Sequence, residues 1–136
     1  MRAKSAEVSF HLHATEDGPK VDKALMASLG VQTTSSEPLY GHNGNIIVDM
    51  RCALDGPQAE SLLLKVLGGL PSTDRARLHA ELGQHFDEKG TFFLRLDKQE
   101  MVLGHLALGE SDAIRMRFKL EAKGMEAEAM VRECLT

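Results

Sequence analysis

One short segment, residues 114–120, restricts the fold of this chain more than any other. Its sequence, Ile-Arg-Met-Arg-Phe-Lys-Leu, alternates apolar and cationic side chains without a break. Successive side chains of a β-strand point to opposite faces of the sheet, so this alternation predicts a strand with one buried and one solvated face. The sheet built around it must bury one side and present cations on the other.

The same alternation and the helical period of 3.6 residues predict the remaining elements. Further strands are expected at 7–13, 46–54, 92–97 and around 101–108. Helices are expected from after Asp17 to Gly30, from Asp55-Gly56-Pro57, after Ser72 to Asp74, and over 125–135. The polar segment 31–43 contains Pro38 and is expected to be a loop or a short edge strand, and residues 41–45 (Gly-His-Asn-Gly-Asn) a turn.

This order, β-α-β-α-α-β-β-β-α, predicts an α+β fold: a mostly antiparallel sheet with helices on one face. A chain of 136 residues fits a single domain, residues 1–136. No run of 18 apolar residues and no secretory signal is seen, so a cytoplasmic protein without a membrane span is expected. Cys52 and Cys134 lack CxxC spacing and are expected to be buried thiols.

The residues of functional interest lie on the strand face opposite the core. If helices cover the other side, this face presents Ser9, His11, His13, Arg51, Phe93, Arg95, Arg115, Arg117 and Lys119. Several RNA-binding modules present such a surface, because phosphates need fixed cations and unstacked bases need an aromatic platform. An alternative is that the Lys and Arg residues only protect a solvated sheet from aggregation.

The overall charge weighs against general affinity for nucleic acids. The chain has 16 Lys and Arg against 20 Asp and Glu, a formal net charge of −4. Phosphate affinity is carried mainly by Lys and Arg, so RNA binding requires a local basic face. The acidity favours a second hypothesis, a protein-interaction or assembly subunit whose basic face docks an acidic partner or another copy in a homodimer.

A third hypothesis is a metal-dependent RNA hydrolase. His11 and His13 place two imidazoles on one strand face, which is compatible with a metal pair, and Asp17, His42 or Asp49 would supply a third ligand. The sequence contains no HExxH motif, GxSxG elbow or phosphate-binding-loop ending. Solvated histidines are the simpler interpretation, so no metal, cofactor or catalytic residue is predicted.

Four strings in register resemble a known family: HATED at 13–17, YGHNGNIIV at 40–48, FFLRLDKQ at 92–99, and LGE followed by the basic strand at 108–120. Together they resemble the archaeal RNA-binding-domain family described as predicted exosome subunits, from about residue 8 to residue 121. The resemblance implies a fold similar to that of the ribosomal protein that binds 5S ribosomal RNA. It also implies exosome or ribosome-related proteins as partners.

The leading prediction is therefore a non-catalytic RNA-binding protein. In the segment 95–99, Arg95 and Lys98 would meet phosphates, while Asp97 and Gln99 would hydrogen-bond bases or shape a hairpin. The predicted RNA-binding residues are Arg51, Phe93, Arg95, Lys98, Gln99, Arg115, Arg117 and Lys119.

Overall fold

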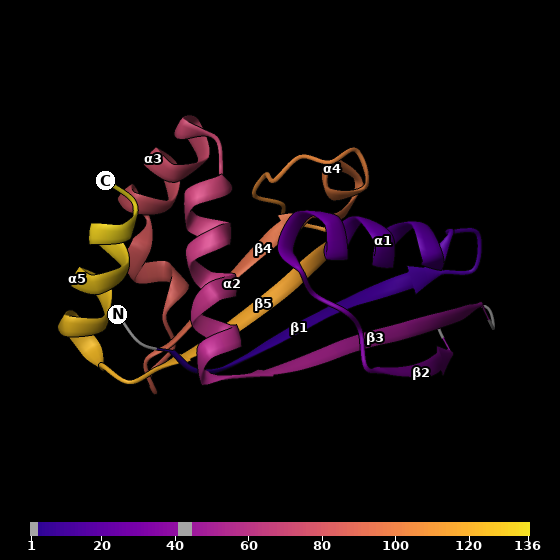
Figure 1. The fold of residues 1–136 in the computed structure, drawn as a ribbon, viewed down its shortest axis with the longest axis horizontal. Coiled ribbons are helices and arrows are strands. Elements are labelled where there is room, and N and C mark those ends of the chain that lie inside the picture. Colours follow the sequence, from indigo (N-terminus) through magenta and orange to yellow (C-terminus); the bar gives the residue numbers. More distant parts are fainter. Residues whose placement is uncertain (1–2, 41–44) are drawn as a thin grey trace.

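The computed structural model describes residues 3–40 and 45–136, and over these ranges the chain forms one five-stranded sheet, five α-helices and a 3-10 helix (Figure 1). The strands are β1 (Ala3–His13), β2 (Ser35–Tyr40), β3 (Ile46–Asp55), β4 (Thr91–Asp97) and β5 (Ala113–Leu120). The helices are α1 (Gly18–Leu29), α2 (Gly56–Gly69), α3 (Ser72–Ala80), η2 (Leu82–His85), α4 (Lys98–Val102) and α5 (Gly124–Cys134).

The sheet has the strand order β2-β3-β1-β5-β4, and every neighbouring pair is antiparallel. The longest strand, β1, lies at its centre and pairs with β3 on one side and β5 on the other. Helices α1 to α5 all lie on one side of the sheet, and none of the described residues forms a helix on the opposite side (Figure 1). The predicted α+β fold with helices on one face is confirmed.

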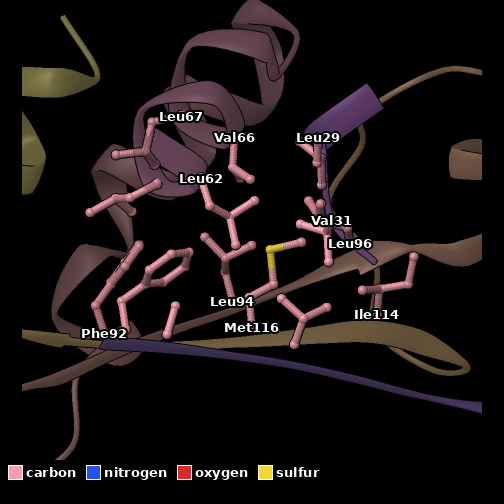
Figure 2. Close-up of a cluster of buried hydrophobic side chains, with 14 of the residues drawn as sticks. Leu29, Val31, Leu62, Val66, Leu67, Phe92, Leu94, Leu96, Ile114 and Met116 are labelled. Carbon is pink, nitrogen blue, oxygen red and sulfur yellow. The ribbon is translucent and has the colours of Figure 1, made fainter. Parts of the chain in front are cut away.

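The core fills the space between the sheet and the helices (Figure 2). The buried stripe of α2 faces apolar side chains of β4 and β5; the labelled members are Leu62, Val66, Leu67, Phe92, Leu94 and Met116. Full burial of a side chain of this size contributes about 1.5–3 kcal/mol, so this contact is a main source of stability. The apolar residues of the alternating strand β5 are all buried, as predicted: Ile114, Met116, Phe118 and Leu120.

The first helix begins and ends where the sequence predicts. The carboxylate of Asp17 accepts a hydrogen bond from the Lys20 backbone N–H, which satisfies one of the free donors at the helix start. Gly30 closes the helix in the left-handed conformation, with φ of 68°, which glycine adopts without steric strain.

One predicted strand is absent from the described segment 101–108, and the segment predicted as a loop or edge strand contains an edge strand. The strand expected around 101–108 is wrong: Lys98–Val102 is the helix α4, because the Asp97 carboxylate accepts from the Glu100 N–H and caps a new turn. Only Leu108 makes an isolated bridge, to Leu96. The polar segment before residue 41 does contain an edge strand, β2, exposed along its whole length. The turn predicted at 41–45 falls largely outside the described residues.

Gly109 holds the next segment against the edge of β4. Its N–H donates to the Arg95 carbonyl, and a Cβ at this position would lie 2.8 Å from the Asp97 backbone. No other residue type fits such a close approach, so this glycine fixes where the loop before β5 begins.

Among the residues described, no helix combines the length and apolar character that a membrane crossing requires.

Candidate nucleic-acid interface

The strand registers bring most of the predicted residues onto one open surface. Arg51 pairs with Ser9, Ser9 with Arg115, and Arg115 with Arg95, so these residues form one row across four strands. Opposite residues in neighbouring antiparallel strands point to the same face. A second row joins Glu7, Arg117 and Phe93. The prediction that these side chains share a face is confirmed.

Four cations of this face gather on the two strands β4 and β5; we call Arg95, Arg115, Arg117 and Lys119 the basic patch. Within residues 3–40 and 45–136, none of the four lies within ion-pair distance of a carboxylate. The guanidinium of Arg95 instead donates to the Glu110 carbonyl at 3.1 Å, and that of Arg115 lies 3.3 Å from His11 Nε2. The patch therefore carries net positive charge on an acidic protein.

Phe93 lies inside the basic patch. It is the cross-strand neighbour of Arg117, and its side chain is 37% exposed. The ring of His85 lies beside it, tilted by 44°, and His85 Nδ1 is 2.9 Å from the Phe93 carbonyl. An exposed aromatic ring bordered by cations offers a base a stacking surface and its phosphates a counter-charge.

Arg51 differs from the patch because its charge is already compensated. Its Nε donates to Asp49 at 2.6 Å, and its Nη1 donates to Glu7 at 2.9 Å. The hydrogen bond and the charge of Asp49 raise the pKa of Arg51 above its ordinary value. Asp49 is buried and needs this partner, so Arg51 has a structural role whether or not it contacts a ligand.

Two hollows flank the patch. One, of about 240 Å³, is lined by His11, Arg95, Glu110, Ser111, Asp112, Ala113 and Arg115. The other, of about 280 Å³, includes Arg117, Lys119 and Thr91 among its lining residues. Each hollow has two cations of the patch at its border.

Lys98 does not lie on this face, contrary to the prediction that it meets a phosphate. Its side chain is 1% exposed, and its Nζ donates at 2.7 Å to each of the His11 carbonyl, Glu16 Oε1 and Asp112 Oδ1. An ammonium has three donors, so all are engaged within the chain. Gln99 is exposed on α4, which packs against α1 on the covered side, so it also lies off the open face (Figure 1).

The cluster around Lys98 includes three possible metal ligands. His13, Glu16 and Asp112 bring ligand atoms within 4.8 Å of one another, but the Lys98 ammonium lies between the two carboxylates and supplies the cation. His11 does not join them, because its Nε2 lies 3.3 Å from Asp49 Oδ1 instead. The predicted pair His11 and His13 therefore contacts different groups.

The other proposed metal ligands are placed elsewhere. Asp17 caps α1 and Asp49 pairs with Arg51. His42 lies outside the described residues. The structural role of Asp112 and the place of Ser111 at a hollow were not predicted from the sequence. Both residues lie at a turn before the basic strand, where an acidic side chain is usually interpreted as solvated.

Asp112 is held in an uncommon conformation. Its φ is 46°, a left-handed value that Asp adopts more readily than most residues. Burial raises the pKa of its carboxyl, but hydrogen bonds and charge from Lys98 and His13 outweigh burial and lower the pKa below its usual value. The ionised carboxylate therefore anchors the loop that enters β5.

An antiparallel sheet with one open face, cations on it and an exposed aromatic among them defines a class of surface used by single-strand RNA-binding domains. A family model with the description RNA binding matches residues 5–120 of the chain. The chain belongs to this RNA-binding family, which agrees with the RNA-binding part of the resemblance found in the sequence.

Relatives extend the match over the whole chain. RNA-binding protein PAB1135 of Pyrococcus abyssi is 31% identical over 140 residues, covering 97% of this chain and 91% of that protein. The structure of Mth689, a DUF54 protein from Methanothermobacter thermautotrophicus, superimposes with a TM-score of 0.83 at 30% identity and covers 100% of both chains. SSO0741 from Sulfolobus solfataricus has the same fold, with a TM-score of 0.82 at 20% identity over 96% of each chain.

Proposed function

We propose that this protein is a non-catalytic RNA-binding protein that holds a single strand across β4 and β5. The observation that carries the proposal is the uncompensated basic patch with Phe93 exposed inside it. On the other half of the same face Arg51 is paired with Asp49 and Glu7, whereas no cation of the patch makes an ion pair within the described ranges. The family membership and the name of the Pyrococcus relative agree with RNA as the ligand.

The arrangement favours a single strand over a duplex. Arg115, Arg117 and Lys119 project from β5 at intervals of about 7 Å, twice the rise of a strand residue. That interval is close to the phosphate spacing of an extended RNA strand. Phe93 then lies beside the middle cation, where an unstacked base would rest; a duplex hides its base faces and offers nothing to stack.

Association with the exosome is the finer part of the proposal, and it rests on the sequence resemblance. The RNA-binding face lies opposite the helices, so a protein partner would have the helical side available while RNA is bound (Figure 1). Mixing the purified protein with reconstituted archaeal exosome, with and without RNA, and measuring co-elution tests it. Failure to co-elute under both conditions removes the exosome from the proposal and leaves RNA binding untouched.

The direct test is binding of the protein to a short single-stranded RNA and to its duplex across a series of salt concentrations. We expect micromolar or tighter binding of the single strand, with log affinity falling steeply against log salt because counterions are released. The duplex should bind more weakly at every salt concentration. Absence of binding even at low salt would overturn the proposal and favour an acidic protein partner for the basic patch.

A further inference from the structure

Arg95 and Arg115 form an unusual pair, because they are direct cross-strand partners with the same charge. Side chains in this relation have Cβ atoms about 4.5–5.5 Å apart, and like charges there repel each other. Elsewhere on the face the chain avoids this arrangement: Arg51 is flanked by Asp49 and Glu7. An anion between Arg95 and Arg115 would turn the repulsion into two attractive contacts.

The space for such an anion is present. The hollow of about 240 Å³ lies against both arginines, and His11 and Ser111 also line it. Each guanidinium has five N–H donors; among the described residues, Arg95 uses one of them for the Glu110 carbonyl, and one Arg115 nitrogen lies 3.3 Å from His11 Nε2. Donors from both arginines remain available to a ligand in the hollow.

One of the two acidic side chains that line the hollow is already engaged by other groups of the chain. Asp112 also lines the hollow, but its carboxylate is bound by the Lys98 ammonium at 2.7 Å and by His13 at 3.3 Å. Glu110 is the remaining carboxylate, and its backbone oxygen, not its side chain, contacts Arg95. The two arginines therefore share the hollow with the Glu110 side chain and with an Asp112 carboxylate that Lys98 and His13 already engage.

The loop that contributes Glu110 and Ser111 to the hollow is anchored at both ends. The loop from Gly109 to Asp112 begins at the tight contact of Gly109 with the Asp97 backbone and ends at the Lys98–Asp112 ion pair. Ser111 is held between these two fixed points. A ligand thus meets a site that is already formed, which reduces the entropy lost on binding.

We propose that this hollow is a seat for one phosphate group, held by Arg95 and Arg115 with the Ser111 hydroxyl as a further donor. The planar fork of arginine matches the oxygens of phosphate in a bidentate manner, and two such forks from adjacent strands enclose it. The inference rests on the proposed function in that the phosphate belongs to RNA. It goes further by assigning one fixed point from which the rest of the strand runs toward Phe93 and Lys119.

The first test uses inorganic phosphate as the probe. Titration of the full chain, followed by NMR signals of the arginine Nε–H groups, should shift Arg95 and Arg115 together and leave Arg132 unchanged. Arg132 is exposed on α5, far along the chain and on the covered side. Either Arg95→Gln or Arg115→Gln should weaken phosphate binding at least about tenfold, the loss expected for one charge-assisted hydrogen bond, whereas Arg132→Gln should not.

A melting measurement provides a second readout that does not depend on assigned signals. Phosphate should raise the melting temperature of the wild type and of Arg132→Gln, because a ligand stabilises the state that it binds. It should raise that of Arg95→Gln much less, although this variant is at least as stable without phosphate since the repulsion is gone. Equal stabilisation of all three proteins, with no selective shift of Arg95 and Arg115, would overturn the seat.

Binding experiments with RNA distinguish a failure of the phosphate seat from a failure of the proposed function. Preference for a 5′-phosphorylated strand over the 5′-hydroxyl strand, lost in Arg95→Gln, assigns the seat to a strand end; equal loss for both strands assigns it to an internal phosphodiester. If RNA binds but Arg95→Gln and Arg115→Gln lose no more affinity than Arg132→Gln, the seat is wrong and the remaining patch holds RNA. If phosphate shifts both arginines while no RNA binds, the seat stands and the proposed function fails.

Discussion

Lys98 shows how a single residue can join distant parts of this chain. Its ammonium contacts the end of β1, the turn before α1 and the loop before β5, through His11, Glu16 and Asp112. Three of the four segments that resemble the family, residues 13–17, 92–99 and 108–120, meet at this point. The sequence alone did not show it, because the spacing of a Lys in a string says nothing about which distant acids it will meet.

Replacing Lys98 with Met tests this role. The variant removes the ammonium from the His11 carbonyl, Asp112 and Glu16, of which Glu16 keeps the His13 N–H as a donor. We expect the free energy of unfolding to fall by about 2–3 kcal/mol, less than for a fully buried pair because Asp112 is partly solvated. Urea denaturation measures it. Lys23→Met, at an exposed position of α1, is the control and should change stability by less than about 0.5 kcal/mol.

Asp112 should make stability depend on pH in acid. Its pKa in the folded protein is below the ordinary value of 3.8, so its contribution is fully present above that value and is lost as pH falls through the lowered folded pKa. Asp112→Asn lacks this contribution, and Asn also tolerates positive φ. Between about pH 5 and pH 3, the urea midpoint of the wild type should fall more than that of the variant. Parallel curves would contradict the ion pair.

At the scale of elements, strands and helix caps followed from local rules, and the segment after β4 did not. The alternation in β5 and the Asp17 and Gly30 caps of α1 were readable because each depends on neighbours in sequence. Residues 101–108 show weak alternation, but Asp97 caps a helix there and Gly104 turns the chain with φ of 86°. A short run fits both periods, and here tertiary packing of Met101 decides between them.

Gly109→Ala tests whether the loop before β5 depends on its contact with β4. The new Cβ would lie 2.8 Å from the Asp97 backbone, which cannot move as a side chain tip can. We expect a loss of about 1–3 kcal/mol in unfolding free energy, as for other overpacked sites. Gly68→Ala is the matched control: no atom lies within 4 Å of its Cβ, and Ala favours the helix, so that variant should be unchanged or more stable.

The position of Phe93 among the cations depends on the pairing of two elements, β4 and β5. Phe93→Ala should weaken binding of single-stranded RNA by about 1–3 kcal/mol, the usual contribution of one base stacked on an aromatic ring. Phe93→Tyr keeps the ring and should retain most of the affinity. Fluorescence anisotropy with a labelled RNA measures both. Equal affinity of the Ala and Tyr variants would show that no base stacks on this residue.

For the whole molecule, the decisive property is how charge is divided between the two sides of the sheet. A formal charge of −4 for the whole chain coexists with a basic patch of four cations on the open face. Alternation predicted which residues of each strand face outward. That the outward residues of β4 and β5 lie side by side depended on the strand order β2-β3-β1-β5-β4, which pairs strands far apart in the sequence and has no local signal.

Two variants with the same change in charge on opposite sides of the sheet test directly whether RNA binds the open face. One replaces Arg115, Arg117 and Lys119 with Gln; the other replaces the exposed helical residues Lys20, Lys23 and Lys65 with Gln. Affinity for single-stranded RNA is measured across a salt series for both and for the wild type. We predict that the first loses affinity and that its salt slope flattens by about two to three, while the second keeps both. Equal losses in the two variants would contradict the assignment of RNA to the open face.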